Sequence, residues 1–104
     1  MYGTVARMRV KPGQAQKLME ISDRQNKEMS PGVKGYMGEF VYRLDTDPNE
    51  LILVVLFEDK QSYTANAESP DQDVRYQEVR ACLESDPQWG DGEIIYHFGD
   101  IGGR

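Results

Sequence analysis

Three side chains able to bind or orient an aromatic molecule lie close together in the sequence, at Tyr63, Asn66 and Tyr76. A tyrosine in an apolar cleft can donate a hydrogen bond to a phenol or quinone oxygen while its ring stacks on the substrate. An asparagine amide can orient a substrate but cannot carry protons at neutral pH. The alternative for each tyrosine is a place in the core, with its hydroxyl bonded to the backbone. We therefore expect Asn66 and Tyr63 as candidate catalytic residues and Tyr76 as a substrate-binding residue.

Other reactive side chains are few. His97 is the only histidine, and on the last predicted strand it is interpreted as a structural or interface residue, unless the register shifts by one and turns it into the cleft. Cys82 is the only cysteine, and core packing is favoured over a nucleophilic role. No Cys/His cluster, phosphate-binding glycine loop or nucleophile elbow occurs, so we expect no metal site.

The elements that must position these residues follow from hydrophobic patterning. Residues 51–57, LILVVLF, form an apolar run typical of a strand buried on both faces. Alternating patterns predict further strands over 2–10, 35–44 and 93–98. Helix formers with a thin apolar stripe predict a helix over 14–29, ended by Pro31 and Gly32.

Capping signals break the second helical region in two. Asp59 can cap a short helix over 60–67. Ser69 and Pro70 then begin another helix, with Gln72 completing a capping box, and this helix is predicted to end before Asp86 and Pro87. A short helix leaves a gap over the sheet through which a ligand can enter, and Tyr63, Asn66 and Tyr76 lie beside that gap.

The resulting order, β-α-β-β-α-β, predicts an α+β, ferredoxin-like fold with a four-stranded antiparallel sheet in which strands 2–10 and 51–57 are central. We expect one domain over 1–99 and a C-terminal tail over 100–104. The predicted registers turn one aromatic face toward the helices, so Tyr36 and Phe40 are candidate substrate-binding residues. Trp89, in a predicted loop over 86–92, either closes one end of the cleft or fixes the loop to the core. The aromatic face is predicted to carry Met8, Tyr36, Phe40, Tyr42, Phe57, Tyr96 and Phe98.

The opposite face mixes charged and aliphatic side chains and is too apolar to remain in water, which predicts a homodimer formed through the sheet face. The chain has 12 Lys and Arg against 18 Asp and Glu, a net charge of −6, which disfavours nucleic acid as a partner. No basic segment precedes an apolar one and no run reaches membrane-spanning length. We expect a cytoplasmic protein that binds a small molecule and neither nucleic acid nor membrane.

Three short stretches carry a resemblance to a known family: VARMRVKPG at 5–13, Pro31 with Gly32, and YTANAESP at 63–70. The chain resembles, over nearly its whole length, the antibiotic biosynthesis monooxygenase-like family of the dimeric α/β-barrel superfamily. The resemblance implies a homodimer whose sheets face each other in a barrel, with a cleft between sheet and helices in each subunit. It also implies oxidation of electron-rich phenols by oxygen without a bound cofactor.

Two departures concern the site. Asn66 stands where many members of the family carry a pocket-facing histidine, which weakens the transfer of acid–base chemistry. The segment 59–84 contains no histidine to serve as an axial ligand, so haem is disfavoured and no cofactor is expected. The sequence thus supports a cofactor-independent monooxygenase acting on a small phenol- or hydroquinone-like substrate. The alternative is a non-catalytic dimeric small-molecule-binding or accessory protein of the same fold.

Overall fold

A computed structural model describes residues 1–99, apart from the side chains at positions 29 and 30. The predicted tail, 100–104, lies outside the described residues. The elements follow the predicted order, with the second helical region divided in two and a short 3₁₀ turn, η1, after the first helix. They are β1 (Tyr2–Arg9), α1 (Ala15–Met29), η1 (Ser30–Gly32), β2 (Tyr36–Leu44), β3 (Asp47–Phe57), α2 (Lys60–Ala67), α3 (Pro70–Arg80) and β4 (Gln88–Glu93).

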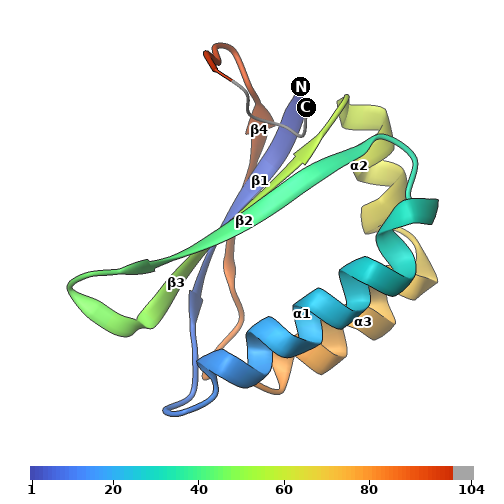
Figure 1. Cartoon of the computed structure of the whole chain (residues 1–104). Coiled ribbons are helices and arrows are strands. Elements are labelled where there is room, and N and C mark those ends of the chain that lie inside the picture. The colour runs from blue at the N-terminus through green and yellow to red at the C-terminus, as the bar shows by residue number, and fades with distance from the viewer. Residues whose placement is uncertain (100–104) are drawn as a thin grey trace.

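The four strands form one antiparallel sheet in the order β2-β3-β1-β4, with the three α-helices on one side of it (Figure 1). The central positions of β1 and β3 confirm the prediction from the LILVVLF run. This is the ferredoxin-like arrangement, which leaves the other face of the sheet without a covering layer within the described chain.

Both predicted helix starts after the central strand are confirmed. The Asp59 carboxylate accepts a hydrogen bond from the Ser62 amide at 2.8 Å and caps α2. The Ser69 hydroxyl accepts one from the Asp71 amide at 3.2 Å, with Pro70 at the first helical position of α3. Helix α3 ends earlier than predicted, at Arg80.

The core lies between the inner, helix-facing side of the sheet and the helices. Its buried residues come from β1, β3, α1 and the segments that follow β1 and α3. In these two segments, Val10 after β1 and Leu83 after α3 form an isolated β-bridge. Cys82 is buried among them, as its predicted packing role requires. The cluster comprises Ala6, Met8, Val10, Leu18, Leu51, Cys82 and Leu83.

The last strand differs from the prediction, because β4 spans Gln88–Glu93 rather than 93–98. The bridge between Val10 and Leu83 fixes where the chain after α3 returns to the sheet. Beyond this bridge, the free edge of β1 runs only from Arg7, opposite Gln88, to Tyr2, opposite Glu93. Residues 94–98 extend past the end of β1, so they form no strand and His97 is exposed outside both core and cleft. Ile95, Tyr96 and Phe98 are also exposed.

The register of β2 also differs from the prediction. Tyr36 pairs with Phe57 and Gly38 with Leu56, so Met37 is an extra residue and forms a β-bulge. Gly38 has a φ of 145°, a value that side-chain-bearing residues rarely adopt. The bulge reverses the alternation, so Phe40 and Tyr42 lie on the outer face, 52% and 49% exposed, and not toward the helices.

The expected strands over 35–44 and 51–57 leave a longer turn between them than the structure has between β2 and β3. Strand β3 already begins at Asp47, which pairs with Leu44. None of the helices in the described part of the chain is both long enough and apolar enough to cross a membrane.

Candidate active site

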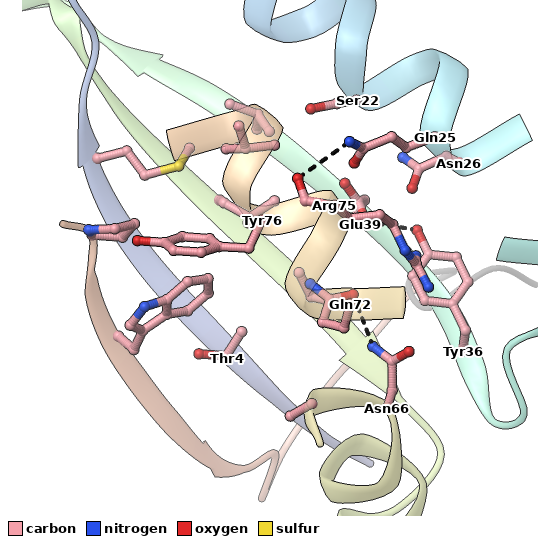
Figure 2. A pocket seen from close by; sticks show the side chains of 18 of the residues that line it. Thr4, Ser22, Gln25, Asn26, Tyr36, Glu39, Asn66, Gln72, Arg75 and Tyr76 are labelled. Atoms are coloured by element: carbon pink, nitrogen blue, oxygen red, sulfur yellow. Dashed lines mark hydrogen bonds between the residues drawn. The ribbon is translucent and has the colours of Figure 1, made fainter. Parts of the chain in front are cut away.

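A cavity of about 740 Å³ separates the inner face of the sheet from the helices. This volume lies within the range of small-molecule sites in proteins. Side chains of β1, β2 and β3 form a mainly apolar floor. Polar side chains of all three helices line the side that faces this floor (Figure 2). The floor consists mainly of Met8, Val41, Leu53, Val55 and Phe57, and its polar side chains are those of Thr4, Tyr36 and Glu39.

Tyr63 lines this cavity from α2, and its ring packs edge-on against Phe57 with centroids 5.6 Å apart. Its hydroxyl donates a hydrogen bond to Asp91 Oδ1 of β4 at 2.8 Å. Burial and this carboxylate raise the pKa of Tyr63 to about 12, against a smaller lowering by the nearby Thr4 hydroxyl. Tyr63 is therefore neutral at physiological pH. Because its proton is directed to Asp91, it offers lone pairs to a ligand rather than a donor.

The Thr4 hydroxyl is buried beside that of Tyr63 but makes no hydrogen bond of normal geometry within the described chain. Buried hydroxyls usually have a partner, since leaving one unpaired is costly. Thr4 faces the cavity from β1. A polar atom of a ligand at this end of the cavity can supply the missing bond.

Asn66 lines the cavity from the last turn of α2. Its Nδ2 donates one long hydrogen bond of 3.4 Å to Gln72 Oε1 of α3 (Figure 2). The second amide N–H and the carbonyl oxygen of Asn66 have no partner among residues 1–99. The amide can therefore donate to one ligand oxygen and accept from another.

Tyr76 of α3 and Trp89 of β4 also line the cavity, with ring centroids 6.4 Å apart. The Tyr76 hydroxyl reaches Asp86 Oδ1 at 3.5 Å, at the limit of a hydrogen bond. Arg80 binds the same carboxylate oxygen at 2.7 Å and is the main cause that lowers the pKa of Asp86. Burial, followed by the charge of Asp86, raises the pKa of Tyr76. Since its bond to Asp86 is weak, the Tyr76 hydroxyl can turn to a ligand at little cost.

The structure brings together most, but not all, of the residues that the sequence pointed to. Tyr36, Tyr63, Asn66, Tyr76 and Trp89 all line the cavity. Their roles stay predictions, because placement alone does not test them.

Phe40 is the exception among the predicted substrate-binding residues. It lies on the outer face of the sheet, away from the cavity, because the bulge at Gly38 reverses the side-chain alternation of β2. The expectation that it contacts a ligand in the cleft is therefore wrong.

Five charged lining residues were missed: Glu39, Asp73, Arg75, Asp86 and Asp91. Glu39 accepts a hydrogen bond from the Tyr36 hydroxyl at 2.8 Å and faces inward only because of the bulge. Asp91 shares a side of β4 with Trp89, which alternation over 88–93 would have shown had the strand been predicted there. Arg75 carries no sequence signal, because it follows no motif and lies in a polar helix.

Comparison with known proteins identifies the family of the chain. The family model described as antibiotic biosynthesis monooxygenase matches residues 1–74. The chain belongs to this family. The matched region includes Tyr63 and Asn66 but ends before Arg75 and Tyr76.

Solved structures of antibiotic biosynthesis monooxygenases share the fold. SnoaB, a cofactor-independent oxygenase from Streptomyces nogalater solved with one asparagine changed to alanine, has 13% identity and a TM-score of 0.79, with 95% of this chain and 97% of that chain covered. A Bordetella bronchiseptica protein that bears the family name has 19% identity and a TM-score of 0.78, with 91% and 97% covered.

A conserved protein from Methanosarcina mazei Go1 has 20% identity and a TM-score of 0.75, with 88% of this chain and 89% of that chain covered. At such identities the similarity concerns the fold. No curated protein gives a significant match.

Proposed function

We propose that this member of the antibiotic biosynthesis monooxygenase family is a cytoplasmic, cofactor-independent monooxygenase acting on a small phenol- or hydroquinone-like substrate. The observation that carries the proposal is the cavity, in which an apolar floor large enough for an aromatic ring system faces an asparagine amide with a free N–H. Family membership supports the reaction class, and the apolar floor of the cavity favours an aromatic substrate.

The reaction is driven by the substrate's own electrons. A phenol with a free para position loses its proton, and the electron-rich ring reduces oxygen. One oxygen atom forms the new carbon–oxygen bond of a quinone, and the other leaves as water together with the two hydrogens that the phenol loses. The protein's task is to bind the phenolate, to orient it and to keep bulk water away from the intermediates.

Asn66 is the residue best placed to stabilise the phenolate, because its free amide N–H can donate to the developing negative oxygen. The weakly bound Tyr76 hydroxyl is a second donor. Tyr63 acts differently, since its proton is held by Asp91 and its oxygen can accept a hydrogen bond from a second substrate hydroxyl. Tyr36 and Trp89 bound the space available to the substrate.

We also propose that the protein works as a homodimer through the outer face of the sheet. That face holds Val5, Phe40 and Tyr42, each about half exposed, and the helices lie on the other side. An apolar patch on an uncovered sheet is typical of an interface between copies. A second copy packed there leaves the cavity under the helices accessible.

The test is oxygen consumption by the purified protein with a panel of phenols and hydroquinones. We expect protein-dependent consumption with a quinone product for at least one compound. Asn66→Ala should lower kcat by about 10²-fold, the effect of losing one donor to a developing oxyanion. Thr64→Ala is the matched control, because Thr64 is exposed on the same helix and does not line the cavity.

Two results would contradict the proposal. Binding of these compounds without oxygen consumption would indicate the non-catalytic alternative. Equal turnover by the wild type and Asn66→Ala would remove Asn66 from the mechanism.

A further inference from the structure

Arg75, in the wall of the cavity, has no counter-ion among the described residues. It lies in the middle of α3 and is partly buried, and its Nε is buried with no hydrogen-bond partner within residues 1–99. Four other arginines, Arg7, Arg9, Arg24 and Arg80, each bind a carboxylate. No carboxylate of the described chain lies within 4 Å of the Arg75 guanidinium. Because a guanidinium is always charged in proteins, Arg75 places a positive charge in the cavity wall that no described carboxylate neutralises.

The neighbourhood of Arg75 holds it in this position. The Gln25 side chain of α1 donates a hydrogen bond to the Arg75 carbonyl oxygen at 3.3 Å and another to Glu78 at 2.9 Å. Gln25 is itself buried. This clamp joins α1 to α3 at the level of Arg75, and Figure 2 shows the Arg75 side chain extending from there toward Tyr36.

The carboxylates that line the cavity are engaged elsewhere or exposed. Glu39 accepts from Tyr36, Asp86 from Arg80 and Asp91 from Tyr63, while Asp73 is exposed in the first turn of α3. Glu39 makes no ion pair with Arg75 within the described chain. Arg75 is the one basic residue among the described residues that line this cavity.

We propose that Arg75 binds an anionic group, a carboxylate, on the ligand of this cavity. The guanidinium and the free amide of Asn66 form a polar end, and the ring system lies over the apolar floor toward Tyr76 and Trp89. A guanidinium matches a carboxylate in both geometry and charge, so the pair is selective as well as strong. The substrate class is thereby narrowed to acidic aromatic compounds, an inference that rests on the cavity being the substrate site of the proposed function.

The test compares two ligands of equal shape, naphthalene-2-carboxylate and naphthalene-2-carboxamide, by isothermal titration calorimetry. We expect the wild type to bind the carboxylate about tenfold more tightly than the amide, as a charge-assisted hydrogen bond allows. Arg75→Gln should abolish this preference and still bind the amide, which shows that the cavity persists. Arg75→Lys should retain part of the preference, because it keeps the charge but loses the planar fork.

Two further variants sharpen the test. Glu39→Gln should increase carboxylate affinity severalfold, since it removes a negative charge from the wall of the same cavity. Arg43→Gln is the control, because Arg43 is an exposed arginine outside the cavity, and it should leave the preference unchanged.

Equal binding of the two ligands by the wild type, or an unchanged preference in Arg75→Gln, would overturn the inference. Neither ligand is a phenol, so the result does not depend on oxygen chemistry. If the protein prefers the carboxylate but consumes no oxygen, the anion site is supported and the proposed reaction is contradicted. If it oxidises neutral phenols without preferring the carboxylate, the proposed reaction is supported and the anion site is contradicted.

Discussion

The two faces of the sheet are built from the same strands but differ in what covers them. The inner face is covered by helices, buries the core and borders a cavity with charged and polar walls. The outer face carries Val5, Phe40 and Tyr42 half exposed, and none of the described helices covers it. The bulge at Gly38 determines which aromatic residues of β2 belong to each face, since it sends Tyr36 inward and Phe40 outward.

This contrast separates the two proposed roles of one small domain. The proposed reaction takes place on the inner face, where the helices supply polar groups. The proposed association uses the outer face, where flat apolar area is available. Changes on one face should therefore leave the job of the other face intact, and the following predictions test that separation in order of decreasing effect.

The largest effect is expected in the inner core. Leu83 is fully buried and does not line the cavity. Leu83→Ala should lower the free energy of unfolding by about 3 kcal/mol, through lost burial and the space left behind. Urea denaturation measures this loss. Phe40→Ala is the comparison on the outer face, and in the monomer it should cost clearly less. An equal cost would mean that the outer face is as well packed as the inner one.

A second large effect concerns association. Phe40→Glu removes apolar area and places a charge in each half of the proposed interface. The dimer dissociation constant should rise about a hundredfold, about 2.7 kcal/mol. Sedimentation at several concentrations detects this change.

The control for association is Val74→Glu, because Val74 is 71% exposed on α3, away from the outer face. It should leave the dimer intact. A wild-type protein that is monomeric at all concentrations would exclude the proposed homodimer, and a dimer unaffected by Phe40→Glu would exclude this face as its interface.

The bulge can be tested directly. Gly38→Ala places a side chain on a backbone with φ 145°, which should cost about 1–2 kcal/mol of stability. A Cβ there meets nothing within 4 Å, so the cost arises from the backbone and not from a clash. Gly92→Ala is the control, since Gly92 also faces open space but has no positive φ. Equal stability of the two variants in urea would mean that the bulge relaxes without strain.

The smallest effect is the pH dependence caused by Tyr63. Its folded-state pKa, about 12, lies above the ordinary value of 10, so the folded protein holds this proton more tightly than the unfolded chain. The associated stability is complete below pH 10 and is lost as the pH rises toward 12.

An absorbance titration of tyrosinate should show one of the six tyrosines ionising near pH 12, and Tyr63→Phe should remove that step. The stability of the variant should decline less steeply between pH 10 and 12 than that of the wild type. A wild type whose tyrosines all ionise near pH 10 would contradict the hydrogen bond from Tyr63 to Asp91.

Local chemistry made much of the fold predictable. The caps at Asp59 and Ser69 and the apolar run at 51–57 each act within a few residues, so the sequence displays them directly. The last strand depends instead on which segment reaches the free edge of β1. Residues 94–98 have the better strand pattern, but the bridge between Val10 and Leu83 delivers 88–93 to that edge.

The candidate site was predictable to a smaller extent. Tyr63, Asn66 and Tyr76 were found because they lie near capped helix ends over the sheet. Phe40 was assigned to the wrong face, since a single extra residue in β2 moves the side chains after it to the opposite face of the sheet. The only sign of this bulge in the sequence is a glycine. Arg75 could not be found, because its lack of a counter-ion depends on where every other charge lies in space.

The contact between Tyr76 and Trp89 gives the cavity an optical reporter. Trp89 is the only tryptophan of the chain, and it lies half exposed at the rim with a tyrosine ring beside it. Its fluorescence emission should therefore shift to shorter wavelength when a bound molecule displaces water from the rim. Ligand occupancy, and its loss in any cavity variant, can be followed in the unlabelled protein without turnover.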